Sequence, residues 1–156
     1  MKCFCKHESP IGPLYLGEED GFLSRLVFSH EDPRLQGYTL GETSVLKQAI
    51  SELSGYFSGT RQRFEVPLRV QGTDFQKRVW DRLRNIPYGE ICSYKDIAVL
   101  LQSPKASRAV GLANKRNPIS IIIPCHRVVG HSGKLVGYAG GLTAKEFLLE
   151  LEQQYV

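Results

Sequence analysis

Three consecutive residues, Cys125, His126 and Arg127, have the side-chain types that a nucleophilic thiol site uses. The cysteine is a soft nucleophile, the histidine can accept its proton, and the arginine is a fixed cation. Pro124 restrains the backbone just before them, and the apolar run 119–123 is typical of a buried core. A buried cysteine that merely precedes a histidine is the alternative, and the pair alone would favour it. Features elsewhere in the chain decide between the two.

The charge of the 156-residue chain is unevenly distributed. Residues 1–70 carry a net charge of −1 (eight Lys/Arg, nine Asp/Glu), and residues 71–156 carry +5 (twelve and seven). No Asp or Glu lies between Ile97 and Lys145, a stretch with seven basic side chains if Lys145 is included. A basic surface free of carboxylates attracts a polyanion, so we expect this part to bind nucleic acid. A solvated basic face without a partner is the alternative.

The number of cysteines and the hydropathy of the chain indicate the cellular compartment of the protein. The four cysteines, Cys3, Cys5, Cys92 and Cys125, are too few and too scattered for a disulfide framework. The N-terminus lacks the apolar core of a signal peptide, and no apolar stretch approaches the length of a membrane span. These features predict a cytoplasmic protein, or a nuclear one in a eukaryote, with no membrane partner. Zinc held by Cys3, Cys5 and His7 or His30 is conceivable, but the spacing matches no structural zinc pattern, so we expect no metal.

Residues 1–70 predict a small domain of antiparallel strands and one helix. Short turns at 9–12 and 18–21 separate segments with strand character. These segments are 2–8, 14–16 and 22–28. Residues 43–57 have apolar side chains at helical spacing, so one amphipathic helix should pack on the sheet. Residues 30–41 are expected to form a loop, and 64–70 an extended segment.

From residue 71 onward the sequence favours short helices. Residues 73–76 and 143–146 have the composition of a capping box, and Ser93 can cap a further helix. In the helix after Ser93, we expect Ile97, Leu100 and Leu101 to face inward.

Two of these short helices are joined by a tight turn, which is typical of a helix-turn-helix. The second would run over 108–114, with Ser107 as its cap. The small side chains of Ala109, Gly111 and Ala113 would let this helix approach a DNA groove. Tight packing against other helices is an equally good explanation for them.

In this order the motifs resemble those of the O6-alkylguanine-DNA alkyltransferase family. The matching segments span about residues 73–152, and they are 75–80, 86–90, 93–94, 108–111, 117–118, 123–129 and 137–142. The first 70 residues match only in general plan. The resemblance implies an α+β chain with a ribonuclease-H-like N-terminal domain, residues 1–70. A mostly helical, helix-turn-helix or winged-helix-like domain that binds DNA and accepts the alkyl group would follow, residues 71–156.

The activity that the resemblance implies is DNA repair by direct reversal. The alkyl group would pass from O6 of a flipped-out guanine to the sulfur of Cys125, because O6 is not open to in-line attack inside a stacked duplex. Each molecule would act once, since the resulting thioether has no leaving route. No cofactor is implied, the partner is double-stranded DNA containing alkylated guanine, and we expect a monomer. Activity on O4-alkylthymine stays open.

The resemblance also implies roles in the chemistry. His126 would act as the base through a bridging water, and Glu152 would orient it. Tyr94 would donate a hydrogen bond to the departing base, and Lys145 would stabilise the thiolate or the developing charge. Asn117 would tie the active-site turn to the recognition helix. The structural alternatives are a half-buried aromatic for Tyr94, exposed charges for Glu152 and Lys145, and a helix stop for Asn117.

For the substrate, the resemblance implies a pocket lined by Val128 and Tyr138, with backbone groups near Ala139 reading the guanine edge. Ala139 stands where many members carry serine, so we expect altered tolerance for bulky alkyl groups. Arg108 would enter the base stack as an arginine finger. The other expected DNA contacts are Tyr94, Lys95, Ser103, Ala109, Gly111, Ala113 and Arg116.

Two other functions remain open from the sequence. A lesion-binding or regulatory helix-turn-helix protein would bind DNA without transfer, but it would leave Cys125 and His126 without a task. A Cys-His hydrolase would turn over repeatedly and would need an oxyanion hole. No second feature of the sequence supports a hydrolase. The presence of Cys125 also argues against the alkyltransferase-like relatives, which lack the acceptor cysteine.

Overall fold

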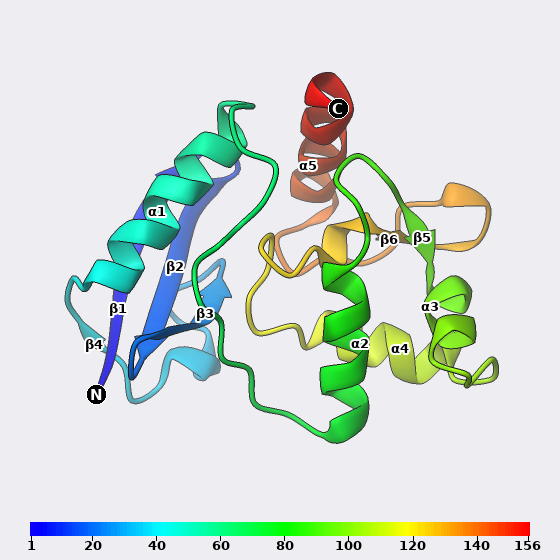
Figure 1. Cartoon of the computed structure of the whole chain (residues 1–156), viewed down its shortest axis with the longest axis horizontal. Coiled ribbons are helices and arrows are strands. Elements are labelled where there is room, and N and C mark those ends of the chain that lie inside the picture. Colours follow the sequence, from blue (N-terminus) through cyan, green and yellow to red (C-terminus); the bar gives the residue numbers. More distant parts are fainter. The chain divides into compact units, whose positions relative to one another are not determined.

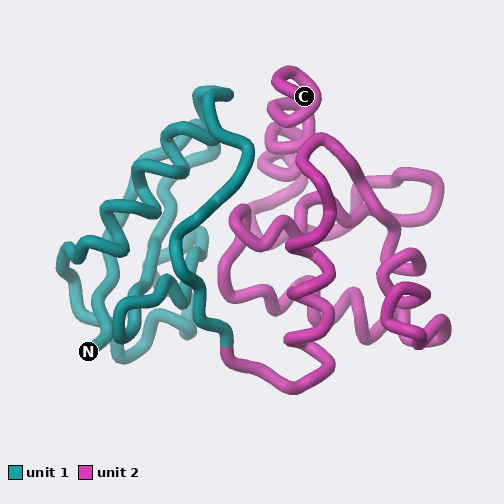
Figure 2. The backbone as a smooth tube through the Cα atoms, viewed as in Figure 1, with its two compact units in different colours: residues 1–70 teal, residues 71–156 magenta.

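The computed structural model describes all 156 residues, and the chain divides into two compact units, Met1–Val70 (unit 1) and Gln71–Val156 (unit 2) (Figure 2). Unit 1 contains, in chain order, β1 (Lys2–Ser9), β2 (Gly12–Glu19), β3 (Phe22–Val27), the 3-10 helix η1 (Pro33–Leu35), β4 (Thr39–Leu40) and α1 (Ser44–Phe57). Helix α1 lies along the sheet (Figure 1).

The sheet of unit 1 has the order β3-β2-β1-β4. The three strands joined by the predicted turns pair antiparallel, as expected. Strand β4, which the sequence did not predict, pairs parallel to β1 at the edge of the sheet. The expected loop over residues 30–41 contains both η1 and β4. Thr39 and Leu40 are both exposed, so this two-residue strand has no inward and outward alternation by which a sequence could reveal it.

Helix α1 begins as predicted, because Thr43 Oγ1 accepts a hydrogen bond from the Leu46 N–H. Its buried face includes one charge that the hydrophobic pattern does not show. The Glu52 carboxylate is 4% exposed and accepts the backbone N–H groups of Glu65 and Val66, at 2.9 and 3.1 Å. This anchor holds the segment 64–70, which is not a strand and makes one isolated bridge to β3 at Leu68.

Unit 2 is mostly helical. It contains α2 (Asp74–Arg84), β5 (Cys92–Ser93), α3 (Tyr94–Leu100), α4 (Ser107–Lys115), η2 (Cys125–Arg127), β6 (Val128–Val129), η3 (His131–Gly133) and α5 (Leu142–Tyr155) (Figure 1). The short strands β5 and β6 pair parallel and join the start of α3 to the segment that follows η2.

Helix starts in unit 2 follow the predicted caps at two of four places. Complete capping boxes form around Thr73 and Ser93. The box predicted at 143–146 is wrong, because α5 already begins at Leu142, preceded by Gly141 in the left-handed region at φ 94°. Ser107 is likewise the first residue inside α4 and not its cap.

Helices α3 and α4 pack on each other and on α2, as expected for a helix-turn-helix with a supporting helix. The indole of Trp80 on α2 donates to the Ala113 carbonyl of α4 at 2.8 Å. Ile97 and Leu101 are buried as predicted, but Leu100 is 50% exposed. Ala98 completes the buried stripe instead, and Leu100 lies about 100° around the helix from its centre.

Candidate functional site

Cys125 lies at the start of η2, directly after the buried segment 119–124. Ile121 has φ 72°, in the left-handed region, and the Cys125 N–H donates to the Ile123 carbonyl at 2.7 Å, so the chain turns sharply before the cysteine. Burial raises the pKa of the Cys125 thiol, against the lowering influence of Asn117, Lys145 and Ser120. The raised pKa favours the thiol form at rest, so a base has to remove the proton of Cys125 before it attacks, as expected from the neighbouring histidine.

The imidazole of His126 and the carboxylate of Glu152 form a buried pair. His126 Nε2 lies 2.6 Å from Glu152 Oε2, and the side chains are 0% and 1% exposed. Since a carboxylate only accepts, Nε2 carries the hydrogen and Nδ1 keeps a lone pair. Nδ1 is buried without a hydrogen-bond partner in the protein. Burial lowers the pKa of His126 despite the adjacent Glu152, so the ring is neutral and can accept a proton.

The same carboxylate also binds the guanidinium of Arg127, the fixed cation of the Cys-His-Arg segment, and the sequence did not indicate this pairing. Arg127 Nε lies 2.7 Å from Glu152 Oε1 and Nη2 lies 3.0 Å from Oε2, while Nη1 donates to the Ile86 carbonyl at 2.7 Å. Burial by itself would raise the pKa of Glu152, but the hydrogen bonds and charges of His126 and Arg127 lower it to about 2.

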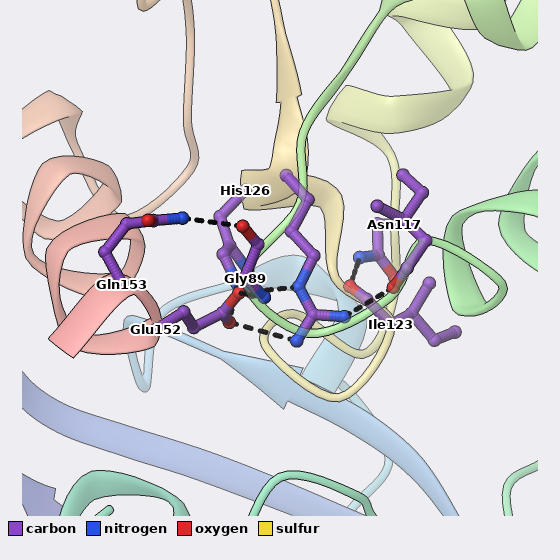
Figure 3. Close-up of polar contacts among 8 residues, drawn as sticks. Gly89, Asn117, Ile123, His126, Glu152 and Gln153 are labelled. Atoms are coloured by element: carbon purple, nitrogen blue, oxygen red, sulfur yellow. Dashed lines mark hydrogen bonds and ion pairs between the residues drawn. The ribbon is translucent and has the colours of Figure 1, made fainter. Parts of the chain in front are cut away.

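The end of α5 is also tied to the turn after α2. The Gly89 N–H donates to Glu152 Oε1 at 3.3 Å, and Gln153 Nε2 donates to the Gly89 carbonyl at 2.6 Å (Figure 3). Gly89 has φ 82°, and an added Cβ would come within 2.6 Å of Val156. Glycine at this position therefore lets the turn approach α5 closely enough to hold Glu152 in place.

Asn117 connects the end of α4 to the turn before Cys125. Its Nδ2 donates to the Ile123 carbonyl at 2.8 Å (Figure 3), and its Oδ1 accepts from the Ile119 N–H at 3.0 Å. The side chain is 2% exposed. These two bonds fix the backbone on which the nucleophile stands.

Lys145 is fully buried on α5. Its Nζ donates to the backbone carbonyls of Val128, Val136 and Gly137 at 2.7, 3.0 and 3.3 Å. Burial lowers the pKa of Lys145, and the nearby Cys125 opposes this shift. Besides placing a positive charge near the thiol, the ammonium group therefore ties the segment before α5 to β6, a structural contribution that the sequence did not suggest.

A cavity of about 470 Å³ opens beside Cys125. Of the residues expected around the substrate, Tyr94, Tyr138 and Ala139 line it together with Cys125. Val128 does not line it, because its side chain is fully buried and only its carbonyl serves the site, as an acceptor for Lys145.

Five residues of the cavity wall were not among the expected site residues: Asn114, Lys115, Ser120, Val136 and Gly137. Asn114 Nδ2 donates to the Cys125 carbonyl at 3.5 Å, and Ser120 forms a hydrogen bond that lowers the pKa of the thiol. The identity of Asn114 was noticed in the sequence, but nothing local indicates that it turns towards the cysteine.

The residues expected to contact DNA divide into two groups. Lys95, Arg108, Ala109 and Arg116 are exposed, Ser103 and Gly111 are partly exposed, and Gly111 also lines the cavity. Ala113 is 2% exposed and packs towards α2, so its predicted DNA contact was wrong.

The basic surface is smaller than the sequence suggested. Of the seven basic side chains in the carboxylate-free stretch, those of Arg127 and Lys145 are buried at the site. The other five are exposed: Lys105, Arg108, Lys115, Arg116 and Lys134.

The structure brings no three His, Cys, Asp or Glu side chains together in a group that could hold a metal ion. Cys3 and Cys5 are both buried, and burial raises the pKa of Cys5 to about 11. None of the helices has the length and apolar character needed to cross a membrane.

Comparison with known proteins gives matches over nearly the whole chain. Residues 74–154 match the DNA-binding domain of 6-O-methylguanine DNA methyltransferase, and residues 5–70 match its ribonuclease-like domain. The methylated-DNA–protein-cysteine methyltransferase of Methanosarcina barkeri is 51% identical over 148 residues, which are 94% of each chain.

Two crystal structures from Mycobacterium tuberculosis are closely similar. The O6-methylguanine methyltransferase has a TM-score of 0.93 at 46% identity, covering 100% of this chain and 95% of that one. OGT in complex with DNA has a TM-score of 0.91 at 47% identity, covering 97% and 93%. These matches confirm the predicted fold class. The chain belongs to the 6-O-methylguanine DNA methyltransferase family.

Proposed function

We propose that the protein repairs O6-alkylated guanine in DNA by transferring the alkyl group to the sulfur of Cys125, once per molecule. The observation that carries this proposal is the position of Cys125 at the wall of a cavity, next in sequence to a buried His126–Glu152 pair whose free imidazole nitrogen can accept a proton. Family membership supports the same reaction. A DNA-binding protein without transfer would have no use for this arrangement.

The transfer is a displacement at the alkyl carbon. The Sγ–C bond forms as the C–O6 bond breaks, and the Cys125 proton passes through one bridging water to His126 Nδ1. The guanine anion leaves with the electron pair and takes up one proton from solvent, and the protonated His126 returns its proton to solvent. Burial raises the pKa of Tyr94, so its phenol at the cavity stays protonated and can donate a hydrogen bond to the departing base.

Recognition of the lesion needs a base outside the duplex. The cavity is bordered by Gly111 on α4, and Arg108 is exposed about one helical turn earlier on the same helix. If α4 approaches the minor groove, Arg108 can fill the space that the flipped nucleotide leaves. A relative has been solved in complex with DNA, which supports a DNA-bound working state.

Arg108→Ala is expected to slow transfer from duplex DNA by about tenfold or more. Flipping the guanine out of the stack costs a few kcal/mol, and without the arginine side chain nothing fills the gap that the guanine leaves. Transfer from free O6-methylguanine should change little. Single-turnover rates on both substrates measure this. Arg63→Ala is the matched control, since it removes one exposed arginine from unit 1. Equal slowing on both substrates would rule out the finger role.

The single use of each molecule has its own test. With lesion-containing duplex in excess, repaired guanine should rise to one equivalent per protein chain and stop. Continued turnover would instead support the hydrolase alternative, and binding without any repair would support the lesion-sensing alternative.

For the chain as a whole, we infer that residues 1–70 form the ribonuclease-like domain and residues 71–156 the domain that binds DNA and accepts the alkyl group. Every group of the site comes from residues 86–153 of one chain, so the protein can act as a monomer. The relatives named above come from an archaeon and a bacterium, whose DNA lies in the cytoplasm, and we place the activity there.

A further inference from the structure

Arg127 carries a buried charge that the proposed reaction does not use. Its side chain is 8% exposed, and it follows directly after His126 in the sequence. A buried cation needs a matching partner, because its desolvation costs several kcal/mol. Arg127 takes this partner from the pair that contains the proposed base.

Arg127 and His126 share one carboxylate. Glu152 Oε2 accepts from His126 Nε2 at 2.6 Å and from Arg127 Nη2 at 3.0 Å, and Oε1 accepts from Arg127 Nε at 2.7 Å. Arginine is always protonated in proteins. The negative charge of Glu152 is therefore already matched by the guanidinium before the imidazole takes up a proton.

Positive and uncharged groups make up the remaining surroundings of the His126–Arg127 pair. Burial lowers the pKa of His126 most, and the positive charges of Arg127 and then of Lys145 on α5 lower it further. The Tyr138 ring stands edge-on to the imidazole with the ring centres 6.5 Å apart. Tyr88 covers the guanidinium, whose central carbon lies 5.6 Å from the ring centre. Helix α2, which packs against η2, buries only uncharged side chains.

We propose that Arg127 is a positioning residue that, by sharing the Glu152 carboxylate, keeps the imidazole of His126 uncharged and its Nδ1 open to the proton of Cys125. This inference rests on the proposed function, in which His126 is the base. With Glu152 alone, a second proton on the ring would complete a buried ion pair and would occupy Nδ1. With Arg127 present, the same proton would add an unmatched positive charge.

Two substitutions separate charge from geometry. Arg127→Gln removes the charge but keeps an amide that can donate to Glu152 or to the Ile86 carbonyl, whereas Arg127→Lys keeps the charge and loses the planar fork. The protonation of His126 is followed by NMR of the intact chain labelled with ¹⁵N-histidine, with the His126 signals assigned from their loss in His126→Asn. The single-turnover transfer rate on an O6-methylguanine duplex is measured over the same pH range.

Arg127→Gln should raise the pKa of His126 by about 1 unit or more, because a positive charge next to the ring is gone. The acid limb of the transfer rate should move up by the same amount, so that transfer is about tenfold slower below the limb and recovers at alkaline pH. Arg127→Lys should keep the wild-type titration and limb, even if its rate is lower at every pH.

An unchanged His126 titration in Arg127→Gln would overturn the proposal, whatever the transfer rate does. Equal loss of rate at every pH in both variants would also overturn it, since it would leave Arg127 a merely structural role. If Arg127→Gln does not fold, the wild-type protein decides, because a doubly protonated His126 ring at neutral pH contradicts the proposal. Absence of transfer by the wild type would refute the proposed function separately, and the titration would still report on Arg127.

Discussion

Cys125→Ser should abolish alkyl transfer and leave the affinity for duplex DNA unchanged. The hydroxyl is far less ionised than a thiol at neutral pH and is a weaker nucleophile, so His126 cannot compensate for the loss. Folding should persist, because serine is smaller and can use the hydrogen-bonding groups of Asn117 and Ser120 that act on the cysteine. Transfer of a radioactive methyl group from duplex DNA, together with a binding titration, measures both properties.

Cys92→Ser is the matched control for this substitution. Cys92 lies in the same unit, on β5, is partly exposed and does not line the cavity. We expect Cys92→Ser to transfer the alkyl group fully and Cys125→Ser not to transfer it at all. Methyl acceptance that survives in Cys125→Ser would contradict the assignment of the nucleophile.

Glu152→Ala should have the largest effect on stability in unit 2. It leaves the buried Arg127 guanidinium without its carboxylate, which typically costs about 3–5 kcal/mol of unfolding free energy. It also frees the His126 ring from its orienting partner, so transfer should fall to background. Urea unfolding and single-turnover transfer measure the two effects. Glu150→Ala is the control on the same helix, since Glu150 is exposed, and it should change the unfolding free energy by less than about 0.5 kcal/mol.

The contribution of Glu152 also has a defined pH dependence. Its folded-state pKa of about 2 lies below the usual value of 4.5. The stabilisation is therefore complete when the pH is above 4.5. It is lost as the pH falls from there towards the folded-state pKa. The wild type should therefore lose stability over this acidic range more steeply than Glu152→Ala, and parallel curves would show that Glu152 is not held ionised by its neighbours.

The sequence predicted the local features of the fold well. Caps such as Thr73 and Ser93 work through residues three positions apart, so their signal is contained in a short segment. The same rule misplaced the start of α5, because the left-handed backbone of Gly141 begins that helix earlier. Strand β4 was missed because its register depends on β1, which lies more than thirty residues away.

The site could be predicted only in part, and for a similar reason. Cys125 and His126 are adjacent, so the sequence alone shows them as a candidate pair, while Glu152 could be connected to them only by resemblance to a family. The sharing of Glu152 by Arg127, and the hold of Lys145 on three backbone carbonyls, arise from tertiary packing of α5 against η2 and the segment before α5. Such contacts have no spacing rule in the sequence.

Peptide mass spectrometry shows whether Cys125 accepts the alkyl group. The protein is mixed with a duplex carrying one O6-methylguanine and digested with trypsin, which releases residues 117–127 as a peptide whose only cysteine is Cys125. We predict one added methyl group on this peptide, in one copy per protein chain, and repaired guanine in the DNA. An unmodified Cys125 with the lesion still in the duplex, or a methyl group on another residue, would show that Cys125 is not the acceptor.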